Sequence, residues 1–113
     1  MKVLVCGSRH FNNLPFIEGV LDAYPITTII EGEARGVDSI ARAYAERRGL
    51  DVLSFPAQWD KYGKSAGPIR NAQMLKEGLP ELVIAFRGPN SRGTQNMIDQ
   101  STKAGVPVVI VDI

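Results

Sequence analysis

Five short runs of apolar and β-branched residues recur along the chain, separated by longer segments of mixed polarity. Most of these runs are continuous rather than alternating, which is typical of strands that are buried on both faces of a parallel sheet. The pattern predicts strands at Val3–Cys6, Thr27–Glu31, Asp51–Phe55, Glu81–Phe86 and Val106–Val111.

The segments between these runs place apolar residues on one face at helical spacing. Pro68 stands at a first-turn position, and Thr94 is a candidate N-cap. Gly78 and Gly105 are candidate stop signals. Helices are therefore predicted at Pro15–Tyr24, Val37–Arg48, Pro68–Glu77 and Thr94–Lys103.

Strands and helices alternate throughout, which predicts an α/β fold with a three-layer, doubly wound, Rossmann-like parallel sheet. Right-handed crossovers most simply give five strands in the order 3-2-1-4-5. The 113 residues suit one domain, 1–113, with no linker or internal repeat. The longest irregular piece is residues 56–67, and a loop of that length in a compact domain is more often functional than idle.

Composition narrows the function class. A net charge of +1 with 22% charged residues is low for a sequence-independent nucleic-acid binder, so no direct nucleic-acid binding is expected. No apolar run approaches the roughly 20 residues of a membrane span, and the N-terminus does not resemble a secretory signal. One Cys and one His argue against a metal site, and the single Cys fits a cytoplasmic location. No cofactor is expected.

Three glycine-containing loops are predicted to meet at the carboxyl edge of the sheet, where strand order reverses between strands 1 and 4. They are Gly7-Ser8-Arg9, residues 32–36 and residues 87–93. Glycine admits close backbone approach, and two of these loops run directly into a helix N-terminus, which attracts anions. This edge is also predicted to hold several guanidinium groups, which bind phosphate or carboxylate well. They belong to Arg9, Arg35, Arg70, Arg87 and Arg92.

The third loop, GPNSRGT, is close to the phosphate-binding pattern G-x-x-x-x-G-K-[ST] but lacks its Lys. A glycine after a strand is often only a turn former, yet three such loops with arginines favour an anion site. Gly63-Lys64-Ser65 imitates the end of the same pattern, but no strand leads directly into it. Cys6 ends a buried strand and is more typical of a core residue than of a nucleophile.

Four segments together resemble a known family: VLVCGSRHF, EGEARGVDSIA, FPAQWDKYGKSAGPIRNAQML and LVIAFRGPNSRGTQNMI. They are similar to the SLOG superfamily of Rossmann-like nucleotide-binding domains, and most of all to its YspA/cpYpsA-related branch, common in phages and bacteria. The resemblance covers nearly the whole chain. It implies a nucleotide or nucleotide-derived ligand.

The best-known members of the superfamily that the chain resembles are the LONELY GUY and lysine-decarboxylase-like phosphoribohydrolases. These enzymes cleave the N-glycosidic bond of nucleoside 5′-monophosphates. By similarity, Arg70 stands at their Arg position, and Gly93-Thr94 at the Gly-Thr that grips phosphate. Their acidic pair is replaced here by Asn96 and Met97, and the loop is longer. Because a carboxylate stabilises the oxocarbenium-like transition state of glycosidic cleavage, these departures argue against hydrolysis.

Three hypotheses follow. The first is a binding module that senses or sequesters a nucleotide-type ligand, with contacts from Gly7, Ser8, Arg9, Gly32, Arg35, Gly36, Arg70, Asn71, Gly88, Gly93, Thr94 and Asn96. The second is a nucleotide N-glycosidase in which Glu33 or Asp38 replaces the missing glutamate, although Asp38 also suits a first-turn helix acid. The third is an interaction protein with a vestigial site, and relatives commonly form homo-oligomers.

Overall fold

The computed structural model describes residues 1–113, in which five strands alternate with helices. The strands are β1 (Lys2–Gly7), β2 (Thr28–Glu31), β3 (Asp51–Ser54), β4 (Leu82–Arg87) and β5 (Val108–Asp112). The helices are α1 (Leu14–Leu21), α2 (Val37–Arg47), α3 (Trp59–Tyr62), α4 (Ala66–Gly78) and α5 (Arg92–Lys103), with a 3-10 turn, η1, at Gly63–Ser65.

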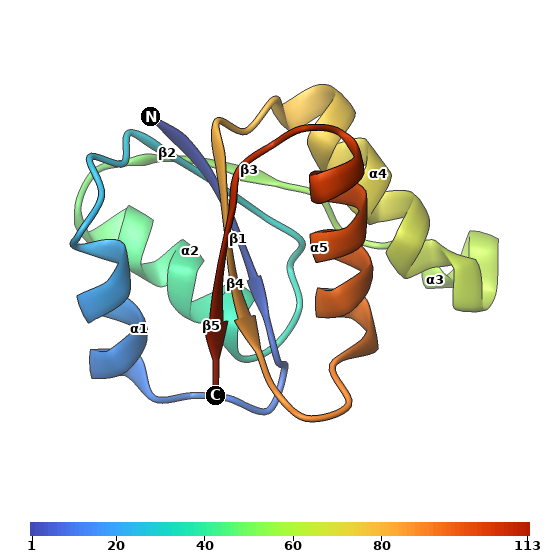
Figure 1. Ribbon diagram of the computed structural model, residues 1–113, viewed down its shortest axis with the longest axis horizontal. Coiled ribbons are helices and arrows are strands. Elements are labelled where there is room, and N and C mark those ends of the chain that lie inside the picture. The colour runs from blue at the N-terminus through green and yellow to red at the C-terminus, as the bar shows by residue number, and fades with distance from the viewer.

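All strand pairs are parallel, and the sheet has the order β3-β2-β1-β4-β5. Helices α1 and α2 cover one face, and α4 and α5 cover the other (Figure 1). This arrangement confirms the predicted three-layer, Rossmann-like α/β fold and its strand order. None of the helices combines the length and the apolar character that crossing a membrane requires.

Two hydrophobic clusters lie on the two faces of the sheet, and β1 contributes to both. Val3 and Val5 pack under α1 and α2, whereas Leu4 and Cys6 pack under α4 and α5. Successive side chains of a strand point to opposite faces, so a strand covered on both sides must be apolar at every position. This is the physical reason for the continuous apolar runs in the sequence.

Two of the predicted helix signals were wrong. Thr94 is not the cap of α5, because the helix begins at Arg92 and Thr94 is buried inside its first turn. Gly78 does not follow α4 but is its last residue, and Leu79 adopts the left-handed conformation. A Cβ on Gly78 would lie 3.0 Å from Ile30, so this glycine serves close packing against β2.

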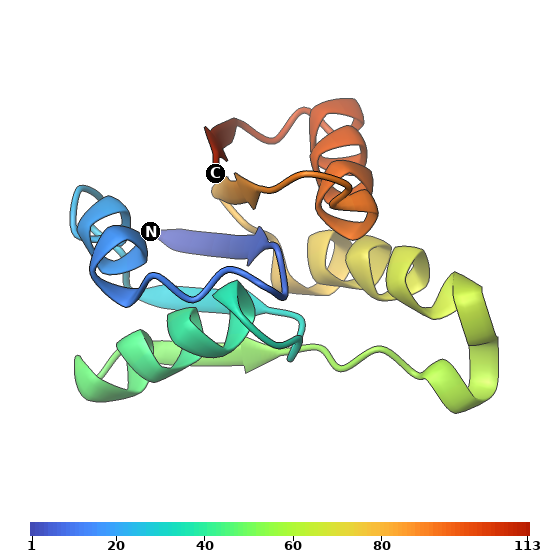
Figure 2. The same ribbon diagram turned by 90° about the horizontal axis from the view of Figure 1, so that it is seen from below.

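Residues 56–65, which we call the arm, were predicted to be irregular but contain α3 and η1. Neither of these short elements has a buried residue, and Trp59 is 59% exposed. Figure 2 shows the arm projecting past the carboxyl end of β3 before the chain returns along α4. The arm therefore lies at the same edge of the sheet as the three glycine-containing loops.

Candidate functional site

The three loops interlock at the carboxyl edge of the sheet through close backbone contacts. Gly36 has a φ of +70°, and a Cβ there would lie 2.6 Å from the carbonyl oxygen of Ser8. A Cβ on Gly88 would lie 3.2 Å from the Cβ of Ser8, and one on Gly7 would lie 2.8 Å from the carbonyl oxygen of Phe86. Side chains at Gly36 and Gly88 would push the loops apart, and a side chain at Gly7 would collide with β4 and with Val37 at the start of α2.

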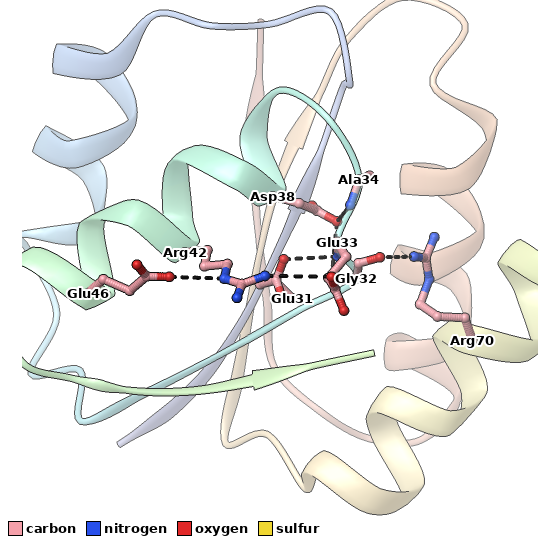
Figure 3. Close-up of polar contacts among 8 residues, drawn as sticks. All are labelled: Glu31, Gly32, Glu33, Ala34, Asp38, Arg42, Glu46 and Arg70. Carbon is pink, nitrogen blue, oxygen red and sulfur yellow. Dashed lines mark hydrogen bonds and ion pairs between the residues drawn. The ribbon is translucent and has the colours of Figure 1, made fainter. Parts of the chain in front are cut away.

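The loop between β2 and α2 uses its own N–H groups to bind its own carboxylates (Figure 3). Asp38 Oδ2 accepts hydrogen bonds from Gly32 N at 3.1 Å and from Ala34 N at 3.2 Å. Glu31 Oε1 accepts one from Glu33 N at 2.9 Å. These three amides are therefore not free to hold an external anion.

Burial controls the ionisation of the two carboxylates in this loop. Asp38 is 5% exposed, and burial raises its pKa to about 6, against the hydrogen bond from Ala34 and the charge of Arg70. Burial also raises the pKa of Glu31, whose Oε2 makes no hydrogen bond. Glu31 was not predicted as a site residue. Its position could have indicated it, because it is a charged residue at the end of an otherwise apolar, buried strand.

The two candidate catalytic carboxylates lie in different surroundings. Glu33 has a left-handed φ of +56°, and its side chain is 37% exposed, with Oε1 lying 3.6 Å from Nη1 of Arg42 on α2 (Figure 3). Asp38 is buried and stabilises the loop through the contacts above. The structure does not bring the two carboxylates together as a pair over one open space.

Arg70 reaches from α4 to the β2–α2 loop (Figure 3). Its Nη1 donates to the carbonyl oxygen of Gly32 at 2.5 Å, and its Nε donates to Asn71 Oδ1 at 3.0 Å. A Cβ on Gly32 would collide with this guanidinium, which explains the glycine. Two hydrogen bonds thus fix Arg70 at the sheet edge, and Nη2 donates no hydrogen bond.

A chain of side-chain amides joins α4 and α5. Asn71 is 4% exposed, and its Nδ2 donates to Asn96 Oδ1 at 3.1 Å and to the carbonyl oxygen of Gly93 at 3.3 Å. Gln100 Nε2 donates to the same Asn96 oxygen at 2.8 Å. Both bonds to Asn96 use its oxygen, and its Nδ2 donates no hydrogen bond within the chain.

The N-terminus of α5 has two free N–H groups. Ser91 occupies the N-cap position but does not cap, because its Oγ accepts from Gly88 N at 3.2 Å instead. The N–H groups of Gly93 and Thr94 donate no hydrogen bonds, and the first turn has no acidic residue. A cavity of about 290 Å³ lies over this loop, lined by Arg87, Gly88, Asn90, Ser91, Arg92 and Gln95. Free amides at a positive helix end form a typical anion site.

Gly93 differs from the other glycines of this edge. It has no left-handed φ, and a Cβ built on it would meet nothing within 4 Å. A glycine inside a helix costs roughly 0.5–1 kcal/mol relative to alanine. The fold of this chain therefore gives no steric reason for glycine at position 93.

The arginines of this edge have different roles. Arg87 forms a two-pronged pair with Asp112, with Nε 2.7 Å from Oδ1 and Nη2 3.1 Å from Oδ2. That pair ties β4 to β5. Arg9, Arg35 and Arg92 are exposed and form no ion pair, so their charges are available at the rim of the site.

A second cavity, of about 220 Å³, lies between the arm and α4. It is lined by Pro56, Gln58, Tyr62, Ala66, Ile69, Arg70 and Gln73. Trp59 is not among these residues and is mostly exposed. Apart from Arg70, none of them was predicted as a site residue, because no motif in the arm indicates that it packs beside α4.

Comparison with known proteins identifies the family. The sequence profile of the "YspA, cpYpsA-related SLOG family" matches residues 1–62, more than half of the chain. The chain belongs to this SLOG family. The Gene 61 protein of Mycobacterium phage D29 is 31% identical over 119 residues, which cover 96% of this chain and 94% of that protein.

SLOG membership confirms the predicted resemblance and suggests a nucleotide-related ligand. The matched region runs from β1 through α3 and includes the first two glycine loops. The loop before α5 lies outside it but inside the part aligned with the phage protein.

Proposed function

We propose that this SLOG protein binds a nucleotide or nucleotide-derived ligand, with a phosphate group on the N-terminus of α5. The main observation behind this proposal is that the N–H groups of Gly93 and Thr94 have no hydrogen-bond acceptor within the chain. The open space beside Gly93 supports it, since close approach of a ligand explains a glycine that the fold itself does not need.

Other groups at the same edge suit the ligand's charge. Arg92 lines the cavity over the loop, and the unpaired Arg9 and Arg35 add positive charge at the rim. Arg70, fixed by Gly32 and Asn71, offers its free Nη2 as a further anion contact. Such a site, without an open catalytic carboxylate, fits sensing or sequestering of the ligand by one domain.

The geometry gives less support to a phosphoribohydrolase. Glu33 faces Arg42, and Asp38 holds the amides of its own loop. Hydrolysis would require one of these carboxylates to leave its present partners and reach the glycosidic carbon. Release of free base from a nucleoside monophosphate, abolished by Glu33→Gln or Asp38→Asn, would restore the enzyme hypothesis.

The test compares two glycines. Gly93→Ala and Gly19→Ala both place a methyl group in open space on a helix, but only position 93 lies at the proposed site. Both variants should gain up to about 0.5–1 kcal/mol of stability from helix propensity. Only Gly93→Ala should weaken ligand binding, by about tenfold or more, because its Cβ occupies the approach to the amides.

Thermal unfolding against a panel of nucleotides, cyclic nucleotides and ADP-ribose derivatives provides the readout. A ligand at a hundred times its Kd adds about 2.7 kcal/mol to the free energy of unfolding. Chromatography of each mixture shows whether the ligand stays intact. Absence of any shift below millimolar ligand, or equal affinities for the two glycine variants, would refute the proposed phosphate site.

A further inference from the structure

We propose that the cavity between the arm and α4 is a nucleobase subsite that prefers adenine. This inference rests on the proposed function, which supplies the class of ligand, but it concerns a different part of the sheet edge. The cavity belongs to residues of the arm and α4, whereas the phosphate site belongs to the β4–α5 loop. Arg70 lines the cavity and also bonds to the β2–α2 loop, so it stands between the two.

The size and the lining of the cavity suit a flat heterocycle. At about 220 Å³ it is smaller than the roughly 300–1,000 Å³ of pockets that enclose whole ligands, so it fits a fragment such as a base. Pro56, Tyr62 and Ile69 provide apolar and aromatic surface. Bases stack favourably on such side chains, and every base offers a π-face.

Two glutamine side chains in the lining supply the specificity. The side chains of Gln58 and Gln73 make no hydrogen bond within the chain, so their amides are free. A carboxamide offers one donor and one acceptor side by side, which matches the N7 acceptor and N6 donor of adenine. Guanine presents two acceptors on the same edge, so a glutamine pairs with it less well.

The strand order shows how one ligand would reach both subsites. The base cavity adjoins the chain that leaves β3, and the phosphate loop follows β4. These strands are three positions apart in the sheet, which corresponds to roughly 14 Å between their ends. Arg70 contacts Gly32 beyond β2 and so lies along this path. A nucleoside diphosphate extended across the edge would span it better than a monophosphate.

Calorimetric titration with ADP, GDP and ribose 5-phosphate tests the inference. ADP should bind about tenfold more tightly than GDP. Substituting both glutamines (Gln58→Ala with Gln73→Ala) should weaken the binding of ADP by about tenfold and make its affinity equal to that of GDP. The affinity for ribose 5-phosphate should not change. Thr102→Ala, at the exposed far end of α5, is the control and should change none of the three. The only tryptophan, Trp59 in the arm, gives a second readout through its emission, which should respond to ADP and not to ribose 5-phosphate.

The outcomes separate this subsite from the proposed phosphate site. The base subsite is overturned if the glutamine substitutions leave the affinity for ADP unchanged, or if ADP and GDP bind with equal affinity. Binding of ribose 5-phosphate would still support the phosphate site in that case. Glutamine-dependent ADP binding without any binding of ribose 5-phosphate supports the base subsite and counts against the phosphate site. If none of the three compounds binds, both are overturned.

Discussion

The buried carboxylate of Asp38 makes the stability of this protein depend on pH in a defined direction. Its pKa is about 6 in the folded chain, against 3.8 for an ordinary aspartate. Between these values the folded chain binds more protons than the unfolded chain, so the free energy of unfolding falls as the pH rises. The pKa difference corresponds to about 3 kcal/mol, a large part of the 5–15 kcal/mol typical of a small domain.

Asp38→Asn isolates this effect. Asparagine keeps an oxygen that can accept from the amides of Gly32 and Ala34, but it cannot ionise. We expect the variant to gain stability relative to the natural chain by about 2.5 kcal/mol as the pH rises from about 4 to about 7. The charge of the nearby Glu31 also helps to raise the pKa of Asp38, and the substitution removes this repulsion as well.

Urea unfolding followed by circular dichroism at several pH values measures the difference between the two proteins. Asp60→Asn, which removes an exposed carboxylate from the arm, is the control and should follow the natural chain at every pH. A difference between Asp38→Asn and the natural chain that stays constant within about 1 kcal/mol over this range would refute the reasoning. Asp38 would then not be desolvated in the way that its burial implies.

Three further predictions concern stability and reactivity. Gly36→Ala and Gly49→Ala both place alanine at a positive φ, but only the methyl group at position 36 would collide with backbone. The free energy of unfolding in urea should therefore fall by about 3 kcal/mol or more for Gly36→Ala and by about 1 kcal/mol for Gly49→Ala. Equal losses would contradict the interlocked loops. Asn71→Ala removes the buried amide that joins α4 to α5 and should cost about 1–3 kcal/mol, with thermal unfolding as the measurement. Cys6 is buried, and burial and the nearby Asp38 raise its thiol pKa well above the usual range, so alkylating reagents should label it only in denaturant; rapid labelling of the native protein would contradict this.

Much of the fold could be predicted from the sequence because two simple constraints determine it. Buried parallel strands need apolar residues throughout, as at residues 82–86, and right-handed crossovers allow few strand orders. The arm was missed as helical because α3 and η1 bury no side chain, so they leave no hydrophobic period to detect. Thr94 was misread as a cap because a threonine before a helical pattern satisfies the same rule whether or not the helix has already begun.

The candidate site was harder to predict because residue types do not show which groups are already paired. The sequence indicated three glycine-containing loops, yet the amide of Gly32 binds Asp38, while the amide of Gly93 binds nothing. Arg70 is held by a carbonyl oxygen 38 positions away in the chain, which no local motif reports. Free and occupied hydrogen-bond donors are properties of tertiary contacts, and the residue types in these loops do not reveal them.

The different packing of the arm and the three loops has a consequence for how this protein can evolve. The loops interlock through glycines at positions 36 and 88, so an inserted or deleted residue in one loop would displace the others. The helical turns of the arm bury no side chain, so insertions and deletions there leave the core intact. Changes of chain length among relatives should therefore concentrate in the arm. The proposed base subsite can then change in sequence while the loop of the proposed phosphate site keeps its geometry.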